Sequence, residues 1–303
     1  KSLAAVAGRR GGSSEAGMIS SWPQQAGKSI QRSLLIWPAL ILTAFFCISI
    51  AGLLAASFQA AGGGHGYTLA HYVRVLTEPL YLDQLVATLR IGFITVLIGL
   101  LLALPIAFWV VRTKRNWVRA ALIMCVTVPF LTSMIVRLYA LTIILANTGL
   151  VNQFLRWIGW VPQDGFLPLL RHEPGVIIGT TAFVLPFMIF MLIGSFRRMD
   201  GTLEEAAASL GANEFKVFFR VTLPLLTPGI VSAMSLGFVL ASVAFSSPLI
   251  LGGGSVNMVA NAIYSEAVQV LDRGTAATLA VLSLAVTALI LYWARRFEFR
   301  SGG

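Results

Sequence analysis

Six long apolar runs dominate the pattern of hydrophobic and polar positions along the chain. Only Arg90 and Arg137 place a charge inside these runs, which cover residues 34–58, 86–111, 120–146, 176–196, 229–251 and 275–293. A helix needs about 20 apolar residues to cross a hydrocarbon core of about 30 Å. Continuous rather than alternating apolarity indicates helices, because unpaired backbone groups are costly in lipid. The pattern predicts an all-α, polytopic membrane protein with six transmembrane helices.

Composition and charge agree with this prediction. The chain is 57% hydrophobic and 11% charged, with a mean hydropathy of +0.83, against about 25% charged residues in soluble domains. A net charge of +10 raises the question of nucleic-acid binding. If the N-terminus is cytoplasmic, however, 16 of the 22 Lys and Arg residues fall on the cytoplasmic side, four fall outside and two fall in the spans. This asymmetry predicts that both termini are cytoplasmic, and no nucleic-acid partner is expected.

The chain divides into four parts by composition. Residues 1–32 are rich in Gly, Ser, Ala and Gln and predict a mobile cytoplasmic tail. Residues 33–85 contain the first span and an extracytoplasmic loop, in which Leu69, Tyr72, Val73 and Leu76 have helical spacing. Residues 86–296 form a core of five further spans, and residues 297–303 form a cytoplasmic C-terminal tail.

Signatures of enzymatic chemistry do not emerge from the sequence. The segment "AGKSI" ends like a phosphate-binding loop, but Trp22 occupies the position of the first required glycine. His65, His71 and His172 fall in the outside loops without a second ligand at metal spacing. The chain is therefore expected to be non-catalytic and to bind no ATP, cofactor or metal itself.

A polar segment between the fourth and fifth spans, residues 200–228, has the signals of two short helices. Thr202 and Glu205 fit a capping box, which predicts that a helix begins at Leu203. Gly211 is placed to end this helix in a left-handed conformation, and Asn213 is placed to cap the next one.

The second short helix carries an apolar face that it cannot bury alone. Phe215, Phe218 and Phe219 share one side at helical spacing, and Pro224 and Pro228 are expected to end regular structure before the fifth span. The segment is either an amphipathic connector on its own bundle or the lipid headgroups, or a docking surface for another protein.

A sequence signature favours the docking surface. "EEAAASLGA", followed ten residues after Gly211 by "VTLP", resembles the E-A-A-x-x-x-G-x9-I-x-L-P signature of permease subunits of binding-protein-dependent, type I ABC importers. The matching residues are Glu205, Ala206, Ala207, Gly211, Leu223 and Pro224, while Val221 replaces the usual isoleucine.

The resemblance implies a multi-pass protein of the bacterial cytoplasmic (inner) membrane that works within a larger transporter. The implied partners are a cytoplasmic ABC ATPase dimer that holds ATP and Mg, a second, non-identical permease subunit, an extracytoplasmic solute-binding protein and membrane lipid. The residues implied to couple the permease to the ATPase are Glu204, Glu205, Ala206, Ala207, Gly211, Ala212 and Phe215.

Finer motifs resemble the spermidine/putrescine branch of these importers. They are "VPFLTSMIVRLYAL", "TGLVN", "SSPLILGGG" and "AIYSEAV". The implied solute is a polyamine, but all twelve Asp and Glu residues fall outside the spans, so a polycation would meet no carboxylate there. An anionic or zwitterionic solute, such as an opine, a phosphonate or an amino acid, stays open as an alternative, and a secondary transporter is the rival class.

Candidate residues of a translocation pathway lie in the third and fifth spans. They are Arg137, Tyr139, Ser246, Ser247 and Pro248. A charge inside the membrane normally faces the bundle interior or a water-filled path, so Arg137 either contacts solute or satisfies backbone carbonyls. Arg90, near the outer end of its span, is expected to extend toward the membrane surface.

Overall fold

The structure is a computed structural model that describes residues 24–59, 66–162 and 164–301. In these ranges the regular elements are helices, and an isolated antiparallel bridge joins Gln59 to Tyr67. Six helices are long and apolar enough to span a membrane: Ile36–Phe58, Pro79–Arg112, Met134–Ile158, Glu173–Arg198, Glu214–Ser242 and Arg273–Ala294. The predicted all-α fold with six spans is confirmed.

The chain divides into two compact units, with the boundary after Leu53. The first contains most of α1 (Gln24–Phe58), which includes the last residues of the predicted tail, whereas residues 1–23 lie outside the described part. Between Ile36 and Ile50 this helix exposes large apolar side chains. Such a surface is suited to lipid or to another apolar helix.

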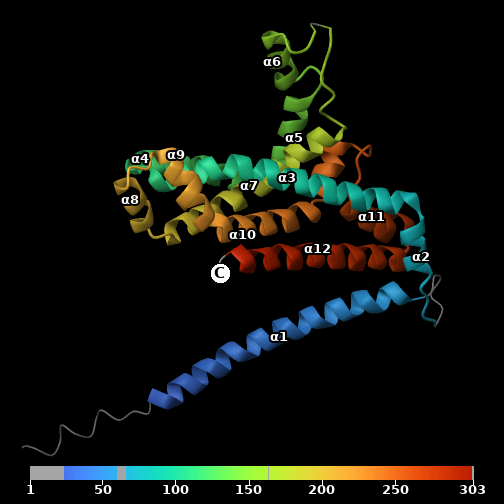
Figure 1. The fold of residues 1–303 in the computed structure, drawn as a ribbon. Coiled ribbons are helices and arrows are strands. Elements are labelled where there is room, and N and C mark those ends of the chain that lie inside the picture. Colours follow the sequence, from blue (N-terminus) through green and yellow to red (C-terminus); the bar gives the residue numbers. More distant parts are fainter. Residues whose placement is uncertain (1–23, 60–65, 163, 302–303) are drawn as a thin grey trace, which may run out of the picture. The chain divides into compact units, whose positions relative to one another are not determined.

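The second unit contains the other helices (Figure 1). The longer ones are α2 (Ala70–Thr77), α3 (Pro79–Arg112), α4 (Asn116–Leu131), α5 (Met134–Leu145), α6 (Leu150–Ile158), α7 (Glu173–Arg198), α8 (Thr202–Ser209), α10 (Leu223–Ser242) and α12 (Arg273–Ser301). The shorter ones are α9 (Glu214–Val217), α11 (Val259–Tyr264) and three π-helical segments, η1 (Phe218–Thr222), η2 (Pro248–Gly252) and η3 (Ser265–Val270). The short outside helix predicted near Leu69 is α2.

The core of this unit forms where α3, α7 and α10 pack together. Each helix contributes a buried stripe of apolar side chains: Val96, Ala103 and Ala107 from α3, Val184, Met188 and Leu192 from α7, and Ala233, Phe238 and Ala241 from α10. Small residues allow close backbone approach between membrane helices, where association depends on packing rather than on the hydrophobic effect. Two short helices, α2 and α11, pack at the opposite end of α3 from α8 and α9, and α12 packs against α2, α10 and α11 (Figure 1).

The predicted third span, residues 120–146, is not a single helix. These residues are divided between α4 and α5, with Thr132 and Ser133 between them, and the third stretch long enough to cross a membrane, Met134–Ile158, begins after this break and covers α5 and α6. Pro129 removes one hydrogen bond from the last turn of α4, and the hydroxyl of Thr132 donates to the carbonyl of Val128 at 2.9 Å. Both features favour an end to the helix at this point.

The fifth span is displaced from its predicted position. Regular helical structure is continuous from α9 through η1 to the end of α10, so the prediction that Pro224 and Pro228 end it is wrong. The π-helical hydrogen bond from Leu223 N–H to the Phe218 carbonyl, which spans five residues, accommodates Pro224 at the start of α10. After Ser242 the chain leaves the helix and then forms η2, at the end of the predicted span.

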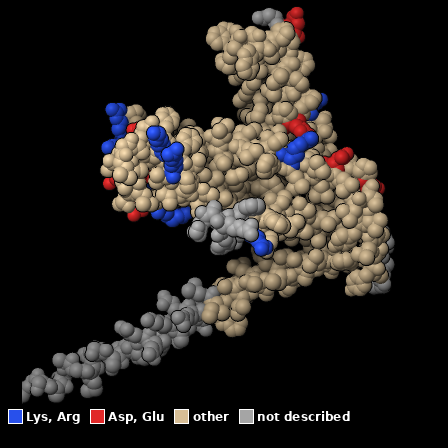
Figure 2. Space-filling model, viewed as in Figure 1, with Lys and Arg blue, Asp and Glu red and all other residues tan. Residues whose placement is uncertain are grey.

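Charged side chains are unevenly distributed over the surface. Figure 2 shows most visible Lys and Arg side chains near α4, α8 and α9, and an almost uncharged surface along the middle of the long helices. This distribution is typical of a bundle whose middle lies in lipid.

Candidate functional site

The polar segment between α7 and α10, residues 200–222, lies beside the end of α3 (Figure 1). We call it the α8–α9 segment. It contains every residue that the sequence signature assigned to ATPase coupling, so the structure brings these residues together in one short stretch.

The start of α8 differs from the prediction. α8 begins at Thr202, and Thr202 forms no side-chain cap. Instead, the Thr202 N–H donates to the carboxylate of Asp200 at 3.0 Å. Hydrogen bonds from the backbone and the side chain of Thr202 lower the pKa of Asp200. The helix therefore begins one residue earlier than predicted, with Gly201 at its N-cap position, and Asp200 supplies the side-chain hydrogen bond at its start.

The end of α8 confirms the prediction for Gly211. Gly211 has φ +82°, in the left-handed region. Its N–H donates to the Ala208 carbonyl at 2.9 Å, and the N–H of Ala212 donates to the Ala207 carbonyl at 3.2 Å. This pair of bonds is the Schellman motif, which satisfies the last carbonyls of a helix. The turn after α8 is thus closed by backbone hydrogen bonds.

The second short helix is also capped as predicted. The side chain of Asn213 accepts a hydrogen bond from the Lys216 N–H at 2.9 Å. The three phenylalanines that follow are not equivalent. Phe218 packs edge-on against Phe108 of α3, with ring centroids 5.3 Å apart, whereas Phe215 and Phe219 are 77% and 60% exposed.

Glu204 ties α8 to two other elements. Its carboxylate forms an ion pair with Arg112 at the end of α3, and it accepts a hydrogen bond of 2.5 Å from the Thr222 hydroxyl in η1. The Glu204 side chain is only 13% exposed, and the Arg112 guanidinium lies 5.3 Å from the Phe108 ring. Partial burial makes this ion pair stronger than a pair on an open surface. A displacement of α8 would therefore pull on α3.

The opposite side of α8 is free within the described chain. Glu205, Ala206 and Phe215 are exposed, and Ala207 and Ala212 are half-buried. A hollow of about 440 Å³ opens between α8, α9 and the end of α3, and its lining includes Glu204, Glu205, Ala208, Ala212, Glu214 and Phe218. The segment presents alanines, an aromatic ring and carboxylates to any protein that meets it.

Arg137 of α5 lies against α7. Its guanidinium donates to the Ala182 carbonyl at 3.1 Å and to the Thr132 carbonyl at 3.3 Å. Ala182 would ordinarily bond to the N–H four residues later, but that residue is Pro186, which has none. Thr132 directly follows the last residue of α4. Arg137 thus donates to two carbonyls that have no helical hydrogen bond. Of the two roles left open by the sequence, solute contact and satisfaction of backbone carbonyls, this is the second.

The remaining pathway candidates occupy different environments. Tyr139 is 59% exposed on α5, and Ser246 is half-buried. Ser247 is fully buried; its hydroxyl donates to the Val176 carbonyl and accepts from the Thr180 hydroxyl, both at 3.1 Å. Pro248, at the start of η2, is also buried. Both Arg137 and Ser247 therefore contact α7.

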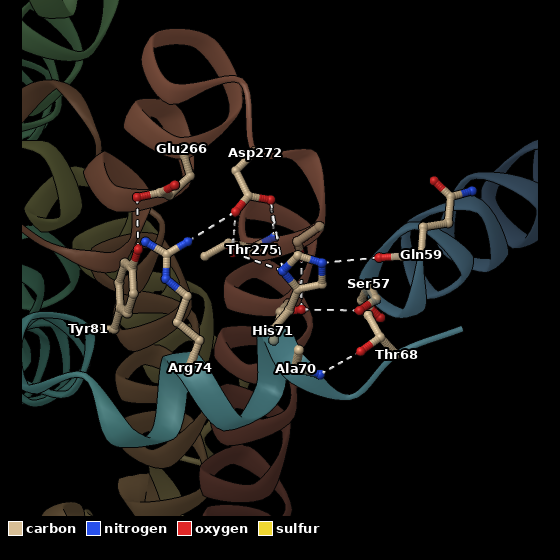
Figure 3. Close-up of polar contacts among 12 residues, drawn as sticks. Ser57, Gln59, Thr68, Ala70, His71, Arg74, Tyr81, Glu266, Asp272 and Thr275 are labelled. Carbon is tan, nitrogen blue, oxygen red and sulfur yellow. Dashed lines mark hydrogen bonds and ion pairs between the residues drawn. The ribbon is translucent and has the colours of Figure 1, made fainter. Parts of the chain in front are cut away.

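A polar cluster that sequence reasoning missed lies at the other end of the unit (Figure 3). His71 of α2 lies between the Thr275 hydroxyl and the Gln59 carbonyl, each 3.1 Å from a ring nitrogen. Arg74 forms an ion pair of 3.2 Å with Asp272. A Cβ atom at position 274 would lie 2.4 Å from the His71 ring, so any side chain larger than that of Gly274 would displace the ring. The cluster fastens α2 to the start of α12.

Two carboxylates in this cluster are held in place by donors. Burial acts to raise the pKa of Asp272, but hydrogen bonds from the Thr275 backbone and side chain, with the charges of His71 and Arg74, outweigh it and lower that pKa. Glu266 of η3 is 8% exposed and accepts a hydrogen bond of 2.9 Å from Tyr81. The contacts of Arg74 with Asp272 and of Tyr81 with Glu266 join residues 198 and 185 positions apart, so they had little signal in the sequence.

Arg90 also pairs with a carboxylate that is distant in sequence. It forms an ion pair with Glu173, in the first turn of α7. This partner lies at the end of a spanning helix, so the expectation that Arg90 extends toward the membrane surface stays a prediction.

The sequence matches the family described as "Binding-protein-dependent transport system inner membrane component" over residues 95–301. The chain belongs to this family. The matched range contains the α8–α9 segment, four complete spans and part of the second span, and the permease is a multi-pass protein of the inner membrane.

Curated relatives include transport proteins of two bacteria. The permease is 32% identical over 229 residues to the spermidine/putrescine transport system permease protein PotB of Escherichia coli (strain K12), covering 75% of this chain and 82% of that protein. It is 35% identical over 218 residues to PotB of Haemophilus influenzae, covering 71% of this chain and 75% of that protein.

Solved structures of ABC transporters share the fold. A chain of a bacterial ABC transporter involved in the import of the acidic polysaccharide alginate matches with a TM-score of 0.74 at 18% identity, covering 92% of this chain and 100% of that chain. A chain of the MetNI methionine ABC transporter matches with a TM-score of 0.56 at 17% identity, covering 74% of this chain and 97% of that chain. The fold is that of an ABC importer permease.

Proposed function

We propose that the permease forms part of a membrane pathway whose opening is driven by ATP hydrolysis on a separate ATPase subunit, to which it is coupled through the α8–α9 segment. The observation that carries this proposal is the construction of that segment. It is closed by a Schellman motif, tied to α3 through Glu204, and exposes Ala206 and Phe215. A rigid unit with an exposed apolar face is suited to receive force from a partner protein and to transmit it to a spanning helix.

The distribution of Lys and Arg indicates which side of the membrane each end of the unit faces. With both termini in the cytoplasm, the α8–α9 segment and the turn between α3 and α4 face the cytoplasm, where Lys and Arg are favoured. Arg112, Lys114, Arg115 and Arg119 lie at that turn. The cluster around His71 then faces the opposite side.

The other parts of the transporter are assigned to partners. We expect an ATPase dimer to hold ATP and Mg, so the permease itself is neither catalytic nor cofactor-dependent. A second, non-identical permease subunit would complete the pathway, and an extracytoplasmic solute-binding protein would deliver the solute. Membership in a binding-protein-dependent family supports this composition.

A polyamine is the solute that the relatives favour, since both PotB proteins are named for spermidine and putrescine. The carboxylates of the described residues lie at the ends of the spans or outside them, so the positive solute would meet carbonyl and aromatic groups at mid-membrane. Arg137 is the feature that favours the alternative, an anionic or zwitterionic solute. Its two carbonyl contacts reduce that objection, because they account for its position without a solute.

Uptake by the reconstituted transporter tests the proposal. The permease, its ATPase, its second permease and its binding protein would be placed in vesicles that contain ATP. We expect accumulation of labelled spermidine or putrescine that requires ATP and the binding protein. Accumulation without ATP in an ion gradient would indicate a secondary transporter, and competition by an anionic solute rather than a polyamine would overturn the solute assignment.

A further inference from the structure

The interruption between α4 and α5 has unusual surroundings for a membrane helix. α4 ends at Leu131 and α5 begins at Met134, and Thr132 and Ser133 adopt extended ψ angles of 141° and 130°. Both residues are exposed in the described part of the chain. The interruption lies inside an otherwise apolar stretch, so the sequence around it does not resemble a surface loop.

The depth of this break can be derived from its contacts with α7. Arg137, which bonds the Thr132 carbonyl, also bonds the carbonyl of Ala182. Phe130, at the end of α4, packs edge-on against Phe187 with ring centroids 5.1 Å apart. Ala182 and Phe187 both fall in the middle third of the 26-residue helix α7. At about 1.5 Å per residue, that third lies more than about 13 Å from either end of the helix.

Backbone polar groups at the break lack partners in the described chain. Among those residues, no acceptor is present for the N–H groups of residues 133–136, and no donor is present for the carbonyls of residues 129–131. The Ser133 side chain forms no cap on α5. Lipid cannot satisfy such groups, and irregular backbone at membrane depth is stable only against protein or in contact with water.

We propose that the α4–α5 break, with the Ser133 hydroxyl and the backbone of residues 132–133, lines the water-filled translocation path. The inference deepens the proposed pathway and rests on it. Water satisfies open donors and open acceptors alike, whereas a covering polypeptide would have to match both sets. Arg137 supports the same assignment, because a guanidinium in a span normally borders protein or water. Its role is then to hold the two ends of the break against α7.

Thiol accessibility tests this assignment in the complete transporter. Cys47 and Cys125 are replaced by alanine, and Ser133→Cys is compared with Leu284→Cys, an exposed apolar position in the middle of α12. A membrane-impermeant methanethiosulfonate reacts with the thiolate, which forms in water and not in lipid. We expect Ser133→Cys to react at least about tenfold faster than Leu284→Cys and its modification to block uptake; both thiols should react after unfolding.

Three outcomes would overturn the inference. Equal, slow reaction at both positions would place the break in lipid. A shielded Ser133→Cys that cross-links to the second permease would show that protein covers the break. Fast reaction with unchanged uptake would place water there but not the solute path. ATP-driven uptake measured before labelling reports on the proposed function separately, so failure of one is distinguishable from failure of the other.

Discussion

Arg137 and Pro186 should be energetically coupled, although they lie in different helices. Pro186 leaves the Ala182 carbonyl without its helical donor, and Arg137 fills that position at 3.1 Å. Arg137→Ala therefore leaves the carbonyl unpaired. Pro186→Ala restores an N–H four residues after Ala182. It should therefore raise the stability of the Arg137→Ala variant more than it raises the stability of the parent protein.

The size of this coupling follows from one buried acceptor. An unsatisfied polar group costs about 1–3 kcal/mol, so the double-mutant coupling should be of that size. At roughly 2–4 °C per kcal/mol, this corresponds to several degrees in Tm. The cycle removes the separate effects of each substitution, including the relief of about 2.5–3.5 kcal/mol expected from removing a charge from the membrane.

Thermal unfolding of the solubilised parent, both single variants and the double variant would measure the coupling. Pro186→Ala in the parent is the matched control, because the carbonyl there already has a donor. If Pro186→Ala changes the Tm equally in the presence and absence of Arg137, the two residues are independent. The structural role assigned to Arg137 would then be wrong.

Three further predictions concern the two ends of the unit. Gly211→Val should destabilise the turn after α8 by about 1–2 kcal/mol because of the left-handed φ, and should speed hydrogen exchange of the α8 amides about 5- to 30-fold. Gly211→Asn should change the exchange rate little, because Asn tolerates this conformation. Equal exchange rates in the two variants would show that side-chain size matters instead. Arg112→Glu and Glu204→Arg should each reduce ATP-driven uptake, and the double reversal should restore part of it, which a purely local role for Glu204 would not produce. Because the pKa of Asp272 is lowered, its stabilising contribution is present above the ordinary pKa of 3.8 and is lost as the pH falls through the lower pKa of the folded protein. Hydrogen-exchange protection of α2 should therefore stay constant down to about pH 3.8 and then decrease, and Gly274→Ala should reduce this protection at neutral pH. Unchanged protection of α2 in both experiments would contradict the fastening role of the cluster.

The features that could be predicted from sequence are those whose cause lies within a few residues. Gly211 and Asn213 were identifiable because a helix end and a helix cap are local events. The start of α8 was missed by one residue, since Asp200 and Thr202 are both favourable acceptors at a helix start and sequence alone did not choose between them. Pro224 was misjudged because η1 changes the hydrogen-bond register ahead of it.

Features that depend on distant contacts could not be predicted. Arg112 and Glu204 are 92 positions apart, and Arg90 and Glu173 are 83 positions apart. The first pair follows from the position of α8 beside the end of α3 and the second from the packing of α3 against α7, rather than from any pattern near these residues. The break after Leu131 was hidden for a different reason, because apolar residues continue on both sides of it.

Photo-cross-linking from Phe215 tests the coupling role of the α8–α9 segment most directly. A photoreactive phenylalanine analogue would replace Phe215, which is 77% exposed, and in a matched control Phe154 of α6, which is 57% exposed. In the assembled transporter, we predict an adduct with the ATPase subunit from position 215 and none from position 154. If position 215 yields no ATPase adduct in an assembly that hydrolyses ATP, the segment does not dock there and the proposed coupling is contradicted.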